Sequence, residues 1–184
     1  MQHPNLYVVT GGPGSGKTTV LRELERRGFG FLPEVARQII QEQMQHGGDA
    51  LPWRNRERYT RLMLEGSIQA FIGHQAGGEI WFADRGIPDT FGYARLTGLR
   101  DDSAIREACK EYRYASTVFL APAWREIYET DTERKQDFAE AERTAEVVRA
   151  VYEECGYRVV ELPRATPVKR AEFVLKRLEG LLNG

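Results

Sequence analysis

The stretch "LYVVTGGPGSGKTTVLRELERRG", residues 6–28, constrains the fold more than any other part of this sequence. An apolar run rich in β-branched residues leads into a glycine-rich loop, and a helical pattern follows the loop. The loop matches the phosphate-binding pattern G-x-x-x-x-G-K-[ST] at Gly11, Gly16, Lys17 and Thr18. Glycines let backbone N–H groups turn toward an anion, and the helix N-terminus adds partial positive charge. The stretch therefore predicts a strand, an anion-binding loop and a helix in succession.

This pattern assigns a task to each polar side chain of the loop. Lys17 is expected to reach the β- and γ-phosphates of a nucleoside triphosphate, and the Thr18 hydroxyl to bind Mg²⁺. Thr19 lies in the first helical turn, where it would contact the α-phosphate or cap the helix. We predict an ATP and Mg²⁺ site at nine residues: Gly11, Gly12, Pro13, Gly14, Ser15, Gly16, Lys17, Thr18 and Thr19.

Short strand-like runs alternate with longer helical patterns along the rest of the chain. The five apolar runs cover residues 6–10, 29–34, 80–83, 117–121 and 157–162. Amphipathic stretches with a helical period separate them, among them the faces Leu64, Ile68, Phe71 and Ile72; Phe138, Ala141, Ala145, Val148, Tyr152 and Cys155; and Val168, Ala171, Val174, Leu178 and Leu181. The alternation predicts an α/β protein whose parallel sheet is covered by helices on both faces. With 184 residues, we expect one domain, residues 1–184.

Composition excludes some classes of protein. The 41% hydrophobic and 29% charged residues are typical of a globular chain, so disorder is not expected. A net charge of -1 gives no overall attraction to nucleic acid. Because no apolar run reaches about 18 residues and no signal peptide is visible, we expect no membrane partner and a cytoplasmic location. The two cysteines and three histidines show no metal-binding spacing.

The segment "EIWFADRGIPD" ends the third strand-like run with Asp84 and continues with Arg85. A carboxylate at this point can hold the Mg²⁺ that Thr18 also contacts. Alternatively, Asp84 is the N-cap of the helix that follows. ATP-driven machines usually carry a glutamate next, to polarise water, whereas Arg85 cannot act as a base. An arginine here predicts neutralisation of phosphate charge during a transfer reaction.

These motifs carry a family resemblance. A phosphate loop near the N-terminus and Asp-Arg about 70 residues later resemble the thymidylate-kinase and deoxynucleoside-kinase group. More closely, "FLPEVARQII", "FADRGIPDTFGYARL" and "IYETDTERKQ" are similar to the small P-loop "AAA-domain" family that includes the ribosylnicotinamide-kinase portion of NadR. The resemblance covers residues 6–182. It implies a P-loop NTPase three-layer sandwich with a five-stranded parallel sheet in the kinase-like order 2-3-1-4-5.

The kinase resemblance singles out Glu34, at the end of the second strand. Deoxynucleoside kinases keep a glutamate there that accepts the proton of the acceptor hydroxyl. If the acceptor group is itself a phosphate, the resemblance to thymidylate kinases implies that Glu34 orients the acceptor instead. Two structural alternatives remain, a charge at a helix N-terminus and an ion pair with Arg37 one turn later.

Residues 124–137, "WREIYETDTERKQD", occupy the place where nucleotide kinases have a mobile lid. A lid carries cations over the phosphates and excludes water. Arg134 is the expected catalytic cation of the lid, with Arg125 and Lys135 beside it and Arg143 as a weaker candidate. The alternative is a charged helix face exposed to solvent.

Further resemblance concerns the nucleobase and the acceptor. In nucleotide kinases the turn after the fifth strand, here "ELPRATPVKR", wraps the adenine, and no guanine-specific Asn-Lys-x-Asp pattern occurs in this chain. ATP is therefore expected. Asp89 and Tyr93 are candidates for the acceptor pocket, and Trp53 and Tyr59 are candidates for stacking on a ring. The alternative is that these aromatic side chains belong to the core, which is the commoner role of an aromatic residue at helical spacing.

Three functions stay open at this stage. The first is an ATP-dependent kinase that acts on a small nucleoside-like or nucleotide-like acceptor. The second is an NTP-binding regulatory ATPase that signals to a protein partner. The third, a polynucleotide end kinase, is disfavoured by the near-neutral charge and by the lack of an aromatic and basic run.

Overall fold

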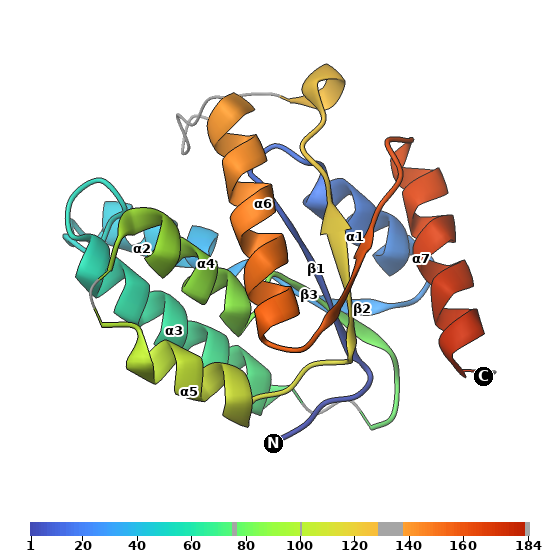
Figure 1. Ribbon diagram of the computed structural model, residues 1–184, viewed down its shortest axis with the longest axis horizontal. Coiled ribbons are helices and arrows are strands. Elements are labelled where there is room, and N and C mark those ends of the chain that lie inside the picture. Colours follow the sequence, from blue (N-terminus) through green and yellow to red (C-terminus); the bar gives the residue numbers. More distant parts are fainter. Residues whose placement is uncertain (75–76, 100, 129–137, 183–184) are drawn as a thin grey trace.

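A five-stranded parallel sheet forms the centre of the computed structural model, which describes residues 1–74, 77–99, 101–128 and 138–182 (Figure 1). The strands are β1 (Leu6–Gly11), β2 (Gly30–Leu32), β3 (Trp81–Asp84), β4 (Thr117–Ala121) and β5 (Arg158–Glu161). Their order in the sheet is β2-β3-β1-β4-β5. The predicted fold class and strand order are confirmed. Among the five predicted strands, the second is shorter than expected, because pairing with β3 involves only three residues.

Eight helical segments surround the sheet in the described part of the chain. They are α1 (Lys17–Arg26), α2 (Val35–Gln45), α3 (Arg56–Gly73), α4 (Ile87–Thr97), α5 (Ser103–Glu111), η1 (Arg125–Ile127), α6 (Phe138–Glu154) and α7 (Pro167–Leu182). Helices α1 and α7 lie on one side of the sheet, and α3 to α6 lie on the other (Figure 1). No helix in the described ranges is long and apolar enough to cross a membrane.

The two faces of β1 contribute to separate apolar cores. Tyr7 and Val9 pack with residues of α1 and α7, whereas Leu6 and Val8 pack with residues of α4 and α6. This division follows from the strand geometry, since successive side chains point to opposite faces of a sheet. All four side chains are nearly inaccessible to solvent. The sheet is therefore the middle of three layers, as the alternating sequence pattern predicted.

A third, smaller core joins α2 to α3 at the side of the sheet. It contains Ile39, Ile40, Leu51, Tyr59 and Met63. Tyr59 is only 3% exposed. The expectation that its ring stacks on a ligand is therefore wrong, because burial among aliphatic side chains stabilises it as part of this core.

The predicted helix faces are correct in their middle and wrong at their ends. On α7, Ala171, Val174 and Leu178 are buried, but Val168 and Leu181 are exposed, and Ile72 near the end of α3 is exposed too. Val168 lies in the first turn of α7, whereas Leu181 and Ile72 lie in the last turns of their helices. The amphipathic pattern does not indicate whether the sheet covers such terminal turns. In the same helix α7, Arg170 is buried, which the amphipathic pattern did not predict.

Strand pairing brings the candidate residues to one edge of the sheet. Val9 of β1 pairs with Asp84 at the end of β3, and Gly11 pairs with Ala121 at the end of β4. Because the strands are parallel, their carboxyl ends meet at this edge, which is where α/β proteins of this kind bind ligands. The register thus places the glycine-rich loop beside Asp84.

Candidate active site

The glycine-rich loop connects the end of β1 to the start of α1 at Lys17. At Gly11, φ is 141°, and an added Cβ would lie 2.2 Å from the Ala121 carbonyl oxygen of β4. Gly16 is the N-cap of α1, with φ 79° in the left-handed region that L side chains rarely adopt. Only glycine meets both requirements, so the two glycines of the sequence motif stand where the backbone demands them.

Two side chains of the loop donate hydrogen bonds to carbonyl oxygens of the same loop. The Ser15 hydroxyl donates to the Gly12 carbonyl oxygen at 2.8 Å. The Lys17 ammonium donates to the same oxygen at 2.9 Å and, more weakly, to the Gly11 carbonyl oxygen at 3.4 Å. Lys17 is 6% exposed. A buried ammonium group is thus held at the mouth of an anion-binding loop, as the motif predicts.

The other loop positions complete this picture. Pro13 is buried, and Gly14 has a φ of 66° and is exposed. The Thr19 hydroxyl donates to the Gly16 carbonyl oxygen at 2.8 Å. Because Gly16 is the N-cap residue of α1, and no side chain caps the helix there, Thr19 does not act as the cap. The expected contact of Thr19 with an α-phosphate stays a prediction.

Thr18 and Asp84 come together from 66 residues apart. The Thr18 hydroxyl donates to Asp84 Oδ2 at 3.4 Å. The other carboxylate oxygen, Asp84 Oδ1, is buried and has no hydrogen-bond partner among the described residues. A buried carboxylate oxygen without a hydrogen-bond partner costs free energy. A hydroxyl beside a carboxylate offers the oxygen ligands that Mg²⁺ prefers. The residues present therefore fit the cation that the motif implies.

The electrostatics of Asp84 agree with a cation site. Burial raises the pKa of Asp84 above its ordinary value, and the nearby carboxylates of Glu34 and Asp89 raise it further. Lys17 and Arg85 act in the opposite direction. The raised pKa means that the ionised carboxylate is less stable at this site than in water. A bound divalent cation would reverse that preference.

Arg85 has the only positive φ of a non-glycine residue in the described ranges, at 73°. Its Nε donates to Glu34 Oε1 at 2.9 Å, and its Nη1 donates to Asp89 Oδ1 at 2.9 Å and to the Gly11 carbonyl oxygen at 2.8 Å. Burial alone would lower its pKa, but Glu34, Asp89 and Asp84 together raise it well above the ordinary value. Such backbone strain, about 1–3 kcal/mol, persists only where surrounding contacts over-determine a residue. The strained backbone therefore aims a permanent cation at the loop.

Asp89 is a buried structural centre rather than a pocket residue. Its carboxylate accepts from the Thr10 hydroxyl at 2.5 Å, the Tyr152 hydroxyl at 2.7 Å, the Gly86 N–H at 2.9 Å and Arg85. The expectation that Asp89 lines the acceptor pocket is wrong, because these four donors saturate it.

The same hydrogen bonds settle how α4 begins. Gly86 is the N-cap residue of α4, and Asp89 three residues later accepts a bond from the Gly86 N–H. The alternative in which Asp84 caps this helix is therefore wrong. Asp84 stays with the strand end and the phosphate loop.

Glu34 follows β2 and is the N-cap residue of α2, without a side-chain capping bond. Its side chain, 10% exposed, pairs with Arg85. The structure thus brings Glu34 to the same edge as the loop, as predicted, and shows Arg85 as an ion-pair partner that the sequence did not suggest. Whether Glu34 acts as a base stays a prediction.

Tyr93, a candidate residue of the predicted acceptor pocket, has a buried hydroxyl oxygen without a hydrogen-bond partner among the described residues. Burial raises the pKa of Tyr93 to about 12, against a smaller opposing effect of Arg56. The hydroxyl is therefore protonated at neutral pH and able to donate. Its ring packs edge-on against Tyr59, with centroids 5.4 Å apart. Trp53, 57% exposed, does not share this environment.

The expected lid is only partly within the described ranges. Arg134 and Lys135 lie outside them. Arg125 is exposed on η1, with its guanidinium carbon 4.2 Å from the centroid of the Phe138 ring. Arg143 is exposed on α6.

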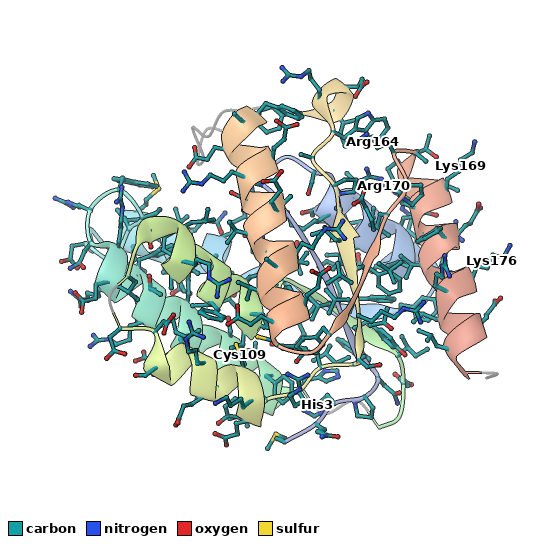
Figure 2. All side chains as sticks on the ribbon, in the orientation of Figure 1. His3, Cys109, Arg164, Lys169, Arg170 and Lys176 are labelled. Carbon is teal, nitrogen blue, oxygen red and sulfur yellow. The ribbon has the colours of Figure 1, made fainter. Side chains whose placement is uncertain are left out.

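Arg170 is a loop contact that the sequence analysis missed. Its Nη1 donates to the Ser15 carbonyl oxygen at 2.8 Å, and its Nε donates to the Pro163 carbonyl oxygen at 2.8 Å. Figure 2 shows Arg170 pointing inward from α7, while Lys169 and Lys176 point to solvent. Within "PVKRAEF" nothing distinguishes a buried arginine from its exposed neighbours, so only the fold reveals it.

This sheet order, loop and strand-end aspartate together define a P-loop nucleotide-binding domain of the kinase type. A model of the AAA-domain family matches residues 6–170. The chain belongs to that family. No curated protein sequence matches the chain.

Solved structures share the fold. Shikimate kinase from Acinetobacter baumannii in complex with shikimate has 20% identity and a TM-score of 0.58, over 96% of this chain and 93% of that one. NadR protein in complex with NR has 21% identity and a TM-score of 0.70, over 96% of this chain and 50% of that one. Deoxyadenosine kinase from M. mycoides with bound dATP has 13% identity and a TM-score of 0.57, over 95% and 99%. The chain thus spans half the length of the NadR chain.

Proposed function

We propose that the protein is an ATP-dependent phosphotransferase that moves the γ-phosphate to a small nucleoside-like or nucleotide-like acceptor. The observation that carries the proposal is the pairing of Thr18 with Asp84, whose second oxygen lacks a partner, followed by an arginine instead of a glutamate. A hydrolytic machine needs a base for water at that point. A transferase needs charge neutralisation and an acceptor.

Each loop group has a defined part in this proposal. Backbone N–H groups of the loop and the Lys17 ammonium hold the β- and γ-phosphates. Thr18 and Asp84 would hold Mg²⁺, which when bound neutralises charge on the phosphate oxygens. Arg85, fixed by the Gly11 carbonyl oxygen and by two carboxylates, keeps a positive charge beside the loop at every physiological pH.

Glu34 is the proposed proton acceptor. When an acceptor hydroxyl attacks the γ-phosphorus, the new P–O bond forms as the bond to the β-phosphate oxygen breaks, and ADP leaves. The hydroxyl proton passes to the Glu34 carboxylate. The ion pair with Arg85 at 2.9 Å fixes this carboxylate at the strand edge. If the acceptor group is a phosphate, no base is needed and Glu34 orients the acceptor.

The proposal also includes the domain and the lid that the sequence predicts. We propose that residues 1–184 act as one domain and that residues 124–137 form a lid, with Arg134 as its cation. The hydroxyl of Tyr93 is available to donate to the acceptor. Fold relatives support a small-molecule acceptor, since their names include a kinase bound to shikimate and a deoxyadenosine kinase with bound dATP. A cytoplasmic location stays a prediction.

A screen for the acceptor tests the proposal. Nucleosides, nucleotides and vitamins would be incubated with the protein, Mg²⁺ and [γ-³²P]ATP, and labelled products separated. We expect one chemical class to take up label and to accelerate ADP release. Lys17→Ala, the matched control, should abolish both through lost phosphate binding. ADP release that no acceptor changes, but that a protein partner stimulates, would instead support a regulatory ATPase.

A further inference from the structure

Arg170 is a buried cation with no ion-pair partner among the described residues. Its side chain is 1% exposed, and no carboxylate of the described residues lies within ion-pair distance of it. Burial lowers the pKa of its guanidinium, with no opposing effect of an acidic group. A third nitrogen, Nη2, is buried without a hydrogen-bond partner among the described residues. A buried charge without a partner is unfavourable in a protein interior, so packing alone does not explain an arginine at this position.

Three segments of the nucleotide side meet at this guanidinium. It donates to Ser15 in the phosphate loop and to Pro163 in the turn after β5. Its central carbon lies 5.2 Å from the centroid of the Trp124 ring, in the segment after β4. An added Cβ at Gly16 would lie 3.3 Å from Arg170 Nη1, so the guanidinium lies directly against the loop backbone.

The bond to Ser15 has a geometric consequence for the next amide. The Ser15 carbonyl and the Gly16 N–H belong to one peptide unit, and no cis peptide bond occurs in the described chain. In a planar trans peptide the C=O and the N–H point in opposite directions. Holding the carbonyl toward Arg170 therefore turns the Gly16 N–H away from α7. A charged donor on the carbonyl also polarises the peptide, which makes its N–H a stronger donor.

We propose that Arg170 is a positioning residue for the phosphate loop: through the Ser15 carbonyl it orients and polarises the Gly16 N–H for binding of a triphosphate. Its uncompensated charge becomes favourable when the polyanion binds, since the two charges then attract across one peptide unit. The inference rests on the proposed function, because it takes a triphosphate as the ligand. It adds a residue from the C-terminal helix to the phosphate site.

Binding measurements with two ligands test the proposal. Mg²⁺-ATP and inorganic tripolyphosphate with Mg²⁺ would be titrated into the wild-type protein, Arg170→Met and Arg177→Met by calorimetry. Arg177 is an exposed arginine of the same helix that packs over the Phe173 ring, so it is the matched control. We expect Arg170→Met to weaken both ligands about 10-fold, as for loss of a charged hydrogen bond. Arg177→Met should bind as the wild type does.

A second measurement separates positioning from a general structural role. In ¹H–¹⁵N spectra of the ligand-free protein, Arg170→Met should shift the Gly16 amide proton upfield and leave the Gly14 amide unchanged. If Arg170→Met does not fold, Arg170→Lys replaces it, and we expect about 3-fold weaker binding with a smaller shift of the same amide.

Three results would overturn the proposal. The first is that Arg170→Met binds tripolyphosphate as the wild type does. The second is that only ATP binding weakens, which would indicate that Arg170 contacts the base. The third is that the chemical shift of the Gly16 amide proton does not change. Failure of the wild-type protein to bind either ligand would refute the proposed function instead. The Gly16 signal would still test the role of Arg170 in that case.

Discussion

Arg85 and Arg170 both donate to carbonyl oxygens of the phosphate loop, but their surroundings are opposite. Arg85 binds the Gly11 oxygen while paired with Glu34 and Asp89, and its pKa is raised. Arg170 binds the Ser15 oxygen without any carboxylate in the described residues, and its pKa is lowered. Within the described ranges, two carboxylates thus neutralise Arg85 before a ligand binds, whereas none pairs with Arg170. The difference indicates that stability depends on Arg85 and that Arg170 matters most when an anion is bound.

The largest expected effect is on stability, from the same substitution at both sites. Arg85→Met removes the positive charge that pairs with the buried carboxylates of Glu34 and Asp89, and should lower the free energy of unfolding by about 3–5 kcal/mol. Arg170→Met removes an uncompensated charge together with two hydrogen bonds, so these effects offset and the change should stay within about 1 kcal/mol. Urea unfolding of the ligand-free proteins measures both. Equal losses would remove the distinction between the two arginines.

Replacing Glu34, one of the two carboxylates beside Arg85, tests whether this ion pair also contributes to catalysis. Glu34→Gln keeps the shape of the side chain but cannot take the acceptor proton. We expect kcat to fall about 100-fold or more with the identified hydroxyl acceptor, while the Kd for Mg²⁺-ATP stays unchanged. Rapid-quench assays and calorimetry would measure the two quantities. An unaltered kcat would exclude Glu34 as the base.

A smaller effect is expected from Asp84→Asn, which changes the cation site between Lys17 and Arg85. Because an amide oxygen is a weaker ligand than a carboxylate, the Mg²⁺ concentration for half-maximal turnover should rise about 10-fold or more. Magnesium titrations at saturating ATP test this, with Asp101→Asn as the control, because Asp101 is exposed and lies just before α5. Identical magnesium requirements in wild type and Asp84→Asn would contradict the assigned metal site.

Local patterns were sufficient to predict the sheet and the nucleotide side of the site. The loop motif and the apolar runs depend on neighbouring residues, and the parallel arrangement then brings Thr18 to Asp84. The buried network of Asp89 with Thr10 and Tyr152 was not predictable, because no sequence motif marks these side chains as partners across 79 and 63 residues. Arg170 escaped prediction for a similar reason, since its partner Ser15 lies 155 residues away. The predicted apolar faces failed at helix ends, where residues such as Leu181 are exposed.

The account depends on a triphosphate held by the loop and Lys17, with its metal between Thr18 and Asp84. The most direct test is a crystal structure of the protein with a non-hydrolysable ATP analogue and Mg²⁺. We predict density for the triphosphate inside the loop and a cation that contacts the Thr18 hydroxyl and Asp84, directly or through one water. A triphosphate bound elsewhere, or an Asp84 carboxylate turned away from the cation, would contradict the account.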